Sequence, residues 1–78
     1  MLASTGGLMR LVEISERVLE ISKAAANGDD EKAHILEDSL WRDVLSAIAF
    51  KNHDGYHAFQ LAAFALESRD IPFSRWCA

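Results

Sequence analysis

The sequence has little of several residue types, and each shortage excludes a class of structure. A single cysteine, Cys77, leaves no internal disulfide, so nothing here indicates folding in an oxidising compartment. One proline and four glycines leave few helix breakers in 78 residues. Runs of Val, Ile, Thr and Tyr typical of strands are missing, whereas the good helix formers Ala, Leu, Glu, Lys and Arg dominate. The sequence therefore predicts an all-α protein.

Basic patches are also missing, which disfavours nucleic-acid binding. The formal net charge is −4, and the acidic residues concentrate between Asp29 and Asp43, where only Lys32 and Arg42 oppose them. A solvated helix face that also complements a helix dipole accounts for this pattern, and a basic partner is the alternative interpretation.

Long hydrophobic runs are missing as well. The N-terminus has no apolar core of signal-peptide length, and the longest apolar run, near residues 56–66, is too short to span a bilayer. We therefore expect no membrane association and a cytoplasmic location.

What is present is the composition of one globular domain. Half of the residues are hydrophobic and about a quarter are charged, which excludes a disordered chain. Apolar residues recur at helical spacing, with breaks at Asn27-Gly28 and at 51–53. We predict a single domain over 1–78, folded as a small antiparallel three-helix bundle with an aromatic C-terminal tail. The predicted elements are helices at about 8–26, 30–51 and 54–69 and a tail at 70–78.

The third predicted helix is apolar almost all the way round. Phe59, Ala63 and Leu66 fall on one side of it, and Leu61 and Phe64 on nearly the opposite side. A helix of this kind is normally buried, and 78 residues offer little material to bury it. We therefore predict a homo-oligomer, most simply a dimer, formed through this helix.

The tail carries residue types that are enriched at interfaces. Phe73, Arg75 and Trp76 belong to this group, and two interpretations stay open: the rings fold back as a lid over the bundle, or they bind a partner. The predicted interface residues are Ala58, Leu61, Ala62, Phe64, Ala65, Phe73, Arg75 and Trp76.

One cluster suggests a metal site as the alternative. His34, Glu37 and Asp38 lie within one turn of the second predicted helix, and a histidine with nearby carboxylates can bind a metal. Because the chain has no second copy of this unit, such a site has to assemble across an oligomer. The other interpretation is a simple His34–Asp38 helix pair, which needs no cofactor.

Four acidic residues offer a second enzymatic alternative. Glu13-x-x-Glu16 and Glu67-x-x-Asp70 resemble the paired acidic motifs of the all-α nucleotide pyrophosphatases of the MazG and dimeric dUTPase type. That resemblance implies magnesium bound by four carboxylates. In those enzymes the second pair lies on a following helix, whereas here far more sequence separates the pairs.

The functional prediction from these patterns is association without catalysis. We expect a small acidic regulator, adaptor or inhibitor with a heterologous protein partner. Proteins of this size and composition are common among the accessory genes of phages and mobile elements, and one half of a toxin–antitoxin or chaperone pair is a further interpretation. A small metal-dependent enzyme or metal-binding subunit is the alternative.

Overall fold

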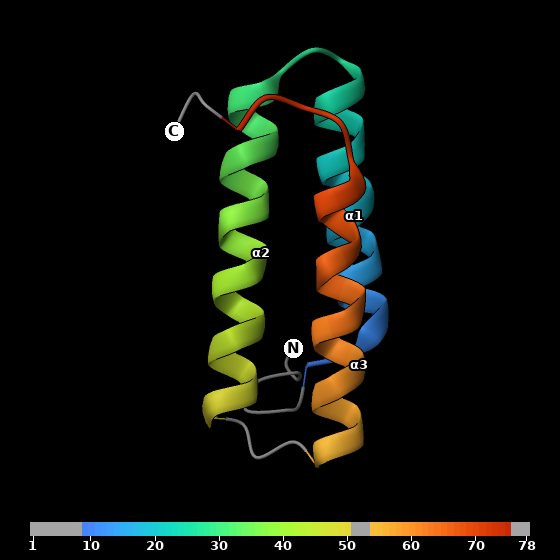
Figure 1. The fold of residues 1–78 in the computed structure, drawn as a ribbon, viewed down its shortest axis with the longest axis vertical. Coiled ribbons are helices and arrows are strands. Elements are labelled where there is room, and N and C mark those ends of the chain that lie inside the picture. Colours follow the sequence, from blue (N-terminus) through green and yellow to red (C-terminus); the bar gives the residue numbers. More distant parts are fainter. Residues whose placement is uncertain (1–8, 51–53, 76–78) are drawn as a thin grey trace, which may run out of the picture.

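The computed structural model describes residues 9–50 and 54–75, and every regular element within them is helical. Figure 1 shows the chain running up the first helix, down the second and up the third, with the helices side by side. The predicted all-α, three-helix fold is confirmed. The elements are α1 over Leu11–Ala26, α2 over Asp30–Phe50, α3 over Gly55–Leu66 and the 3-10 turn η1 over Glu67–Asp70.

The turn between α1 and α2 is fixed by a glycine. Gly28 has φ 78°, in the left-handed region that other residues rarely adopt. Its N–H donates to the carbonyl of Ala25 at 3.0 Å, and the N–H of Asp29 donates to that of Ala24 at 2.9 Å. This pair of bonds is a Schellman motif, which ends α1 and returns the chain directly into α2.

Side-chain carboxylates cap the starts of the helices. The Oδ1 of Asp29 accepts from the N–H of Lys32 at 3.1 Å, and the Oδ1 of Asp54 accepts from the N–H of His57 at 2.8 Å. Each of these bonds satisfies an N–H that has no partner within the helix. Asp29 therefore caps α2, and Asp54 caps α3.

The core is a line of apolar side chains contributed by all three α-helices. Ile14 and Ile21 are seven residues apart, so both point from the same side of α1, and both are fully buried together with Leu40 and Leu61. The complete buried cluster consists of Ile14, Ile21, Ala24, Ala33, Leu40, Val44, Leu61 and Ala65.

The start of the first helix and the end of the third helix differ from the prediction. α1 begins at Leu11 and not at about residue 8 as predicted, because Arg10 has an extended backbone (φ −102°, ψ 149°) and is the N-cap residue; residue 8 itself lies outside the described residues. The last predicted turn of the third helix is a 3-10 turn at Glu67–Asp70, a tighter winding that is common where α-helices end.

The chain itself covers one side of α3. Leu61 and Ala65 lie in the core, and Phe64 packs against it. The opposite side stays open, since Phe59 is 68% exposed and Leu66 is 44% exposed. The surplus apolar surface predicted for this helix therefore lies on the side of Phe59 and Leu66. Leu61 needs no partner to be buried.

No helix in the described ranges is long and apolar enough to cross a membrane.

Truncation of a core side chain is expected to destabilise the fold. Ile21→Ala removes a fully buried side chain and should lower the free energy of unfolding by about 2–5 kcal/mol. The control Leu19→Ala, at a residue on the same helix that is 54% exposed, should change it by about 0.5 kcal/mol or less. Urea denaturation followed by circular dichroism measures both, and equal midpoints for the two variants would contradict this core assignment.

Candidate functional site

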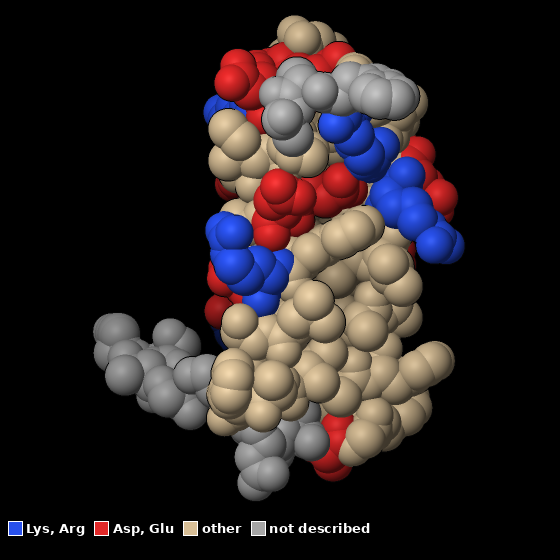
Figure 2. Space-filling model, turned by 60° about the vertical axis from the view of Figure 1, so that its left-hand side comes forward, with Lys and Arg blue, Asp and Glu red and all other residues tan. Residues whose placement is uncertain are grey.

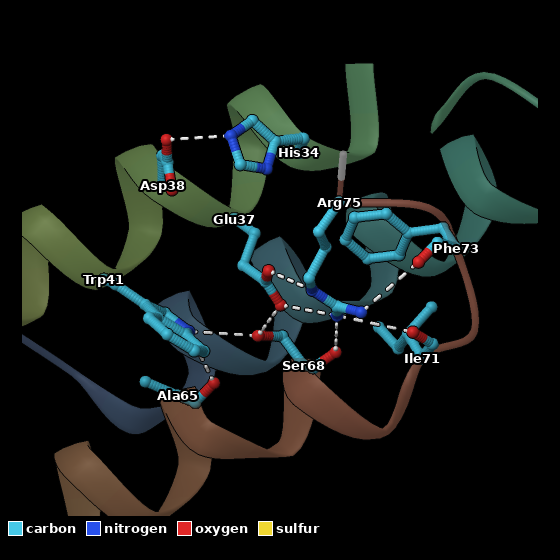
Figure 3. Close-up of polar contacts among 9 residues, drawn as sticks. All are labelled: His34, Glu37, Asp38, Trp41, Ala65, Ser68, Ile71, Phe73 and Arg75. Carbon is cyan, nitrogen blue, oxygen red and sulfur yellow. Dashed lines mark hydrogen bonds and ion pairs between the residues drawn. The ribbon is translucent and has the colours of Figure 1, made fainter. Parts of the chain in front are cut away.

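Two regions of the surface between α2 and α3 are candidates for function. One is a group of polar side chains where η1 and the following segment cross α2 (Figure 3). The other is an apolar groove lower on the same side of the molecule (Figure 2). Both arise because α2 and α3 lie side by side.

The polar group centres on a buried carboxylate. Glu37 lies on the inner side of α2 and is only 3% exposed. Arg75 meets it with two parallel bonds, from Nε to Oε1 at 2.7 Å and from Nη2 to Oε2 at 3.0 Å. This bidentate geometry is among the strongest pairings available to a carboxylate and ties the C-terminal segment to α2.

A serine binds this carboxylate, and a tryptophan in turn binds the serine. Ser68 is fully buried and its hydroxyl donates to Oε2 of Glu37 at 2.7 Å. The indole N–H of Trp41 donates to the Ser68 hydroxyl at 3.0 Å and to the carbonyl of Ala65 at 3.2 Å. The chain of bonds therefore links α2 to both α3 and η1, as Figure 3 shows.

Arg75 also holds the segment that precedes it. Its Nη2 donates to the carbonyls of Ser68 at 3.1 Å and Ile71 at 3.3 Å, and its Nη1 donates to that of Phe73 at 3.4 Å. The guanidinium carbon lies 3.8 Å from the centre of the Phe73 ring, a cation–π contact. One side chain thus folds residues 68–75 into a compact strap.

The charge states follow from these contacts. Burial by itself raises the pKa of Glu37, but the hydrogen bonds from Arg75 and Ser68 and the positive charge of Arg75 outweigh burial, so the net pKa is lowered from its ordinary value of 4.5. The hydrogen bond to Glu37 raises the pKa of Arg75. The pair is therefore ionised at neutral pH.

The structure does not assemble the predicted metal set. His34 and Asp38 form a helix pair at 3.2 Å, whereas Glu37 is directed to Arg75 on the inner side of α2 (Figure 3). The Nδ1 of His34 is buried and has no hydrogen-bond partner among the described residues. No group of three or more metal-ligating side chains occurs within residues 9–50 and 54–75.

The four carboxylates of the pyrophosphatase-like motifs have separate surroundings. Oε1 of Glu13 accepts from the N–H of Arg10 at 2.7 Å and so caps the start of α1. Glu16 is exposed on the same helix, whereas Glu67 and Asp70 lie on η1. They form no joint metal-binding group in the described part of the chain.

The predicted interface residues occupy several surroundings. Leu61 and Ala65 are buried in the core, and Ala58, Ala62 and Phe64 are half-buried on α3. In the tail, Phe73 packs against the core as a lid does, Arg75 is bound to Glu37, and Trp76 lies outside the described residues.

The second region is a groove without charged walls. It has a volume of about 220 Å³ and lies between α2 and α3. Phe59 lies on the same side of α3 as Ala62 and Leu66, which follow it by three and seven residues. Tyr56 precedes Phe59 by three residues and lies on that side too. Figure 2 shows a broad uncharged surface here, with charged side chains gathered mainly above it. The groove is lined by Trp41, Val44, Leu45, Ala62, Ala65 and Leu66.

We name this surface the α2–α3 face, and its large side chains are unusually exposed. Leu45 is 67% exposed, Tyr56 72% and Phe59 68%. Trp41 and Leu45 are four residues apart and so lie on the same side of α2, but the exposure of Leu45 follows from the position of α3 and not from the sequence.

No protein-family model, curated protein or solved structure matches this chain. The polar network around Glu37 and the α2–α3 face are therefore the features from which a function can be proposed.

Loss of Arg75 is expected to destabilise the protein. Arg75→Met leaves the carboxylate of Glu37 buried with Ser68 as its remaining side-chain donor, which should lower the free energy of unfolding by about 1.5–3 kcal/mol. Arg69→Met, on the exposed side of η1, is the matched control. The double variant Glu37→Met/Arg75→Met should regain much of the loss, because an apolar pair replaces a buried ion pair with little net cost. Thermal melts of the four proteins test this, and a double variant less stable than Arg75→Met would contradict it.

The Glu37 pair should also make stability depend on pH. The pKa of Glu37 is lower in the folded protein than in the unfolded chain. Its ionisation therefore contributes fully to the free energy of unfolding above about pH 4.5, and this contribution is lost as the pH falls through the folded pKa. The melting temperature of the wild type should therefore exceed that of Glu37→Gln at pH 6 by more than it does at pH 3. All other carboxylates are common to both proteins, so the change in this difference reports Glu37 alone. A constant difference would argue against an ionised Glu37.

Proposed function

We propose that this protein acts through protein–protein association, as a regulator, adaptor or inhibitor, and not as an enzyme. The observation that carries this proposal is the α2–α3 face. Its exposed leucine and aromatic side chains form a contiguous apolar surface around a groove, and contiguous apolar patches on soluble domains mark binding sites. Self-association through α3 is one form of this function, and a heterologous partner is another.

The energetics favour a covered face. Burying one leucine or phenylalanine that was in water contributes roughly 1.5–3 kcal/mol, and Leu45 and Phe59 are both about two thirds exposed. A domain of this length has a net stability of about 4–12 kcal/mol, so covering these two side chains would add a large fraction of that free energy. Aromatic residues at the centre of a patch are also the typical anchors of an interface.

The polar region supports the same interpretation. The oxygens of Glu37 accept three donor groups, Arg75 Nε, Arg75 Nη2 and the Ser68 hydroxyl, and the carboxylate lies out of reach of solvent. An ionised carboxylate that is paired in this way is poorly suited to take up a proton or a metal ion. Its role is to hold η1 and the strap against α2.

The size and acidic composition remain typical of accessory proteins from phages and mobile elements, and we include that origin in the proposal.

Capture from the native host tests the proposed function. The tagged full chain and Leu19→Glu should retain the same protein, whereas Phe59→Glu should lose it, because a charge at the centre of the face opposes burial. Leu19 is a suitable control because it is apolar and 54% exposed on α1. The captured protein is then purified, and its affinity for the wild-type chain, for Leu19→Glu and for Phe59→Glu is measured by titration. If Phe59→Glu changes neither partner binding nor self-association, the face is not the functional surface and the proposal is wrong.

A further inference from the structure

We infer that the α2–α3 face pairs with the same face of a second copy of this chain. The result is a two-fold dimer in which two α2–α3 layers form a four-helix core, with one α1 on each outer side. This inference rests on the proposed function, since it names the partner of the same surface.

Charge is the first reason to favour a second copy. A two-fold contact places each patch against itself, so a patch with a net charge would repel its own copy. The chain as a whole carries a charge of −4, yet the groove is lined by uncharged residues only. In Figure 2 the charged side chains gather mainly above a broad uncharged surface. Two copies can therefore meet at the centre of this face without like charges opposing each other.

Shape is the second reason. The groove of about 220 Å³ is smaller than the roughly 300–1,000 Å³ typical of small-molecule sites, so an inserted side chain suits it better than a ligand. Leu45 projects from the rim of the groove and Phe59 lies beside Ala62 on its α3 side. Each copy thus offers both projecting side chains and a groove, which is what a self-complementary contact needs.

The area is sufficient for a modest dimer. A fully covered aromatic side chain buries about 150–250 Å², so the exposed parts of Tyr56 and Phe59 alone supply about 210–350 Å². Leu45, Leu66 and the alanines of α3 add to this. A standard interface takes about 800 Å² from each partner, so these two rings supply roughly a quarter to under a half of one partner's share, and the other side chains of the face and a polar rim have to supply the rest.

The architecture gives the fourth reason. Helices of a bundle bury apolar strips on the sides that face other helices, and here α1 covers one side of the α2–α3 layer only. When a second α2–α3 layer lies on the open side, each layer is packed on both of its sides.

Sedimentation velocity of the full chain tests the oligomeric state. The wild type should change from monomer to dimer with a Kd on the order of 1–100 μM. Leu45→Glu/Phe59→Glu should weaken the dimer by at least about 10-fold, whereas Val12→Glu/Leu19→Glu should leave it unchanged. The control adds the same two charges to apolar residues of similar exposure on α1. Circular dichroism confirms that each variant is folded.

A charge-swap experiment identifies the partner as the same face. Leu45→Lys/Phe59→Lys and Leu45→Glu/Phe59→Glu should each be monomeric alone and should form a heterodimer when mixed, because the contact then places lysines opposite glutamates. A wild type that stays monomeric throughout the concentration range overturns the inference, and so does a mixture that stays monomeric. The inference is also overturned if Val12→Glu/Leu19→Glu abolishes the dimer and Leu45→Glu/Phe59→Glu does not. If the monomeric wild type nevertheless binds a foreign protein through Phe59, only this inference fails and the proposed function stands.

Discussion

Packing on only one side of the α2–α3 layer is the constraint on which the other features of this structure depend. A 78-residue chain supplies three helices, and α1 can lie against one side of the α2–α3 pair only. The side chains that face α1, among them Leu40 and Leu61, are fully buried. Those that face away, such as Leu45 and Phe59, stay in water although they are equally apolar. Small domains bury a smaller fraction of their surface. Among the described residues, four of the eight exposed large apolar side chains lie on the α2–α3 face, whereas Val12 and Leu19 are exposed on α1.

The buried carboxylate has a different role, which is to hold the segment after α3 against the bundle. The segment after α3 contains a 3-10 turn and extended residues, and few of its carbonyls can accept the regular bonds of a helix. The carbonyl of Ser68 accepts one such bond, from the N–H of Ile71 at 3.0 Å. Arg75 donates to three of these carbonyls and to both oxygens of Glu37, so one guanidinium satisfies the segment and the carboxylate together. Ion pairs of this kind contribute little net stability compared with apolar packing, but they fix one arrangement of the groups involved. The strap has a defined position for that reason.

The fold could be predicted from the sequence because its signals are local. The recurrence of apolar residues at helical spacing and the breaks at Asn27-Gly28 and at 51–53 each depend on a few neighbouring residues. The exact helix ends could not be predicted, since the last turn of α3 tightens where Ser68 bonds across to Glu37, a contact between residues far apart in the chain.

The site was much harder to predict, and the reason is again sequence separation. Glu37 lies beside His34 and Asp38 in the sequence, which made a metal site plausible, yet its partner is Arg75, 38 residues away. The signal that was available is the position of Glu37 on the same side of the helix as Ala33, Leu40 and Val44. A charged residue on a buried strip requires an opposite charge from elsewhere, and Arg75 is the cation among the aromatics of the tail.

The two regions together support the proposal that this chain acts by association. A catalytic group has to change its protonation or ligand state, but the donors around Glu37 stabilise a single charged state. On the α2–α3 face, exposed apolar side chains surround a groove with apolar walls. Covering these side chains with a partner would lower the free energy by removing apolar surface from water. The strap keeps α3 and η1 in a fixed position relative to α2, because Trp41 on the rim of the groove also donates to Ala65 and Ser68. The polar network therefore sets the shape of the groove, and a surface that is fixed before binding loses less conformational entropy when a partner covers it.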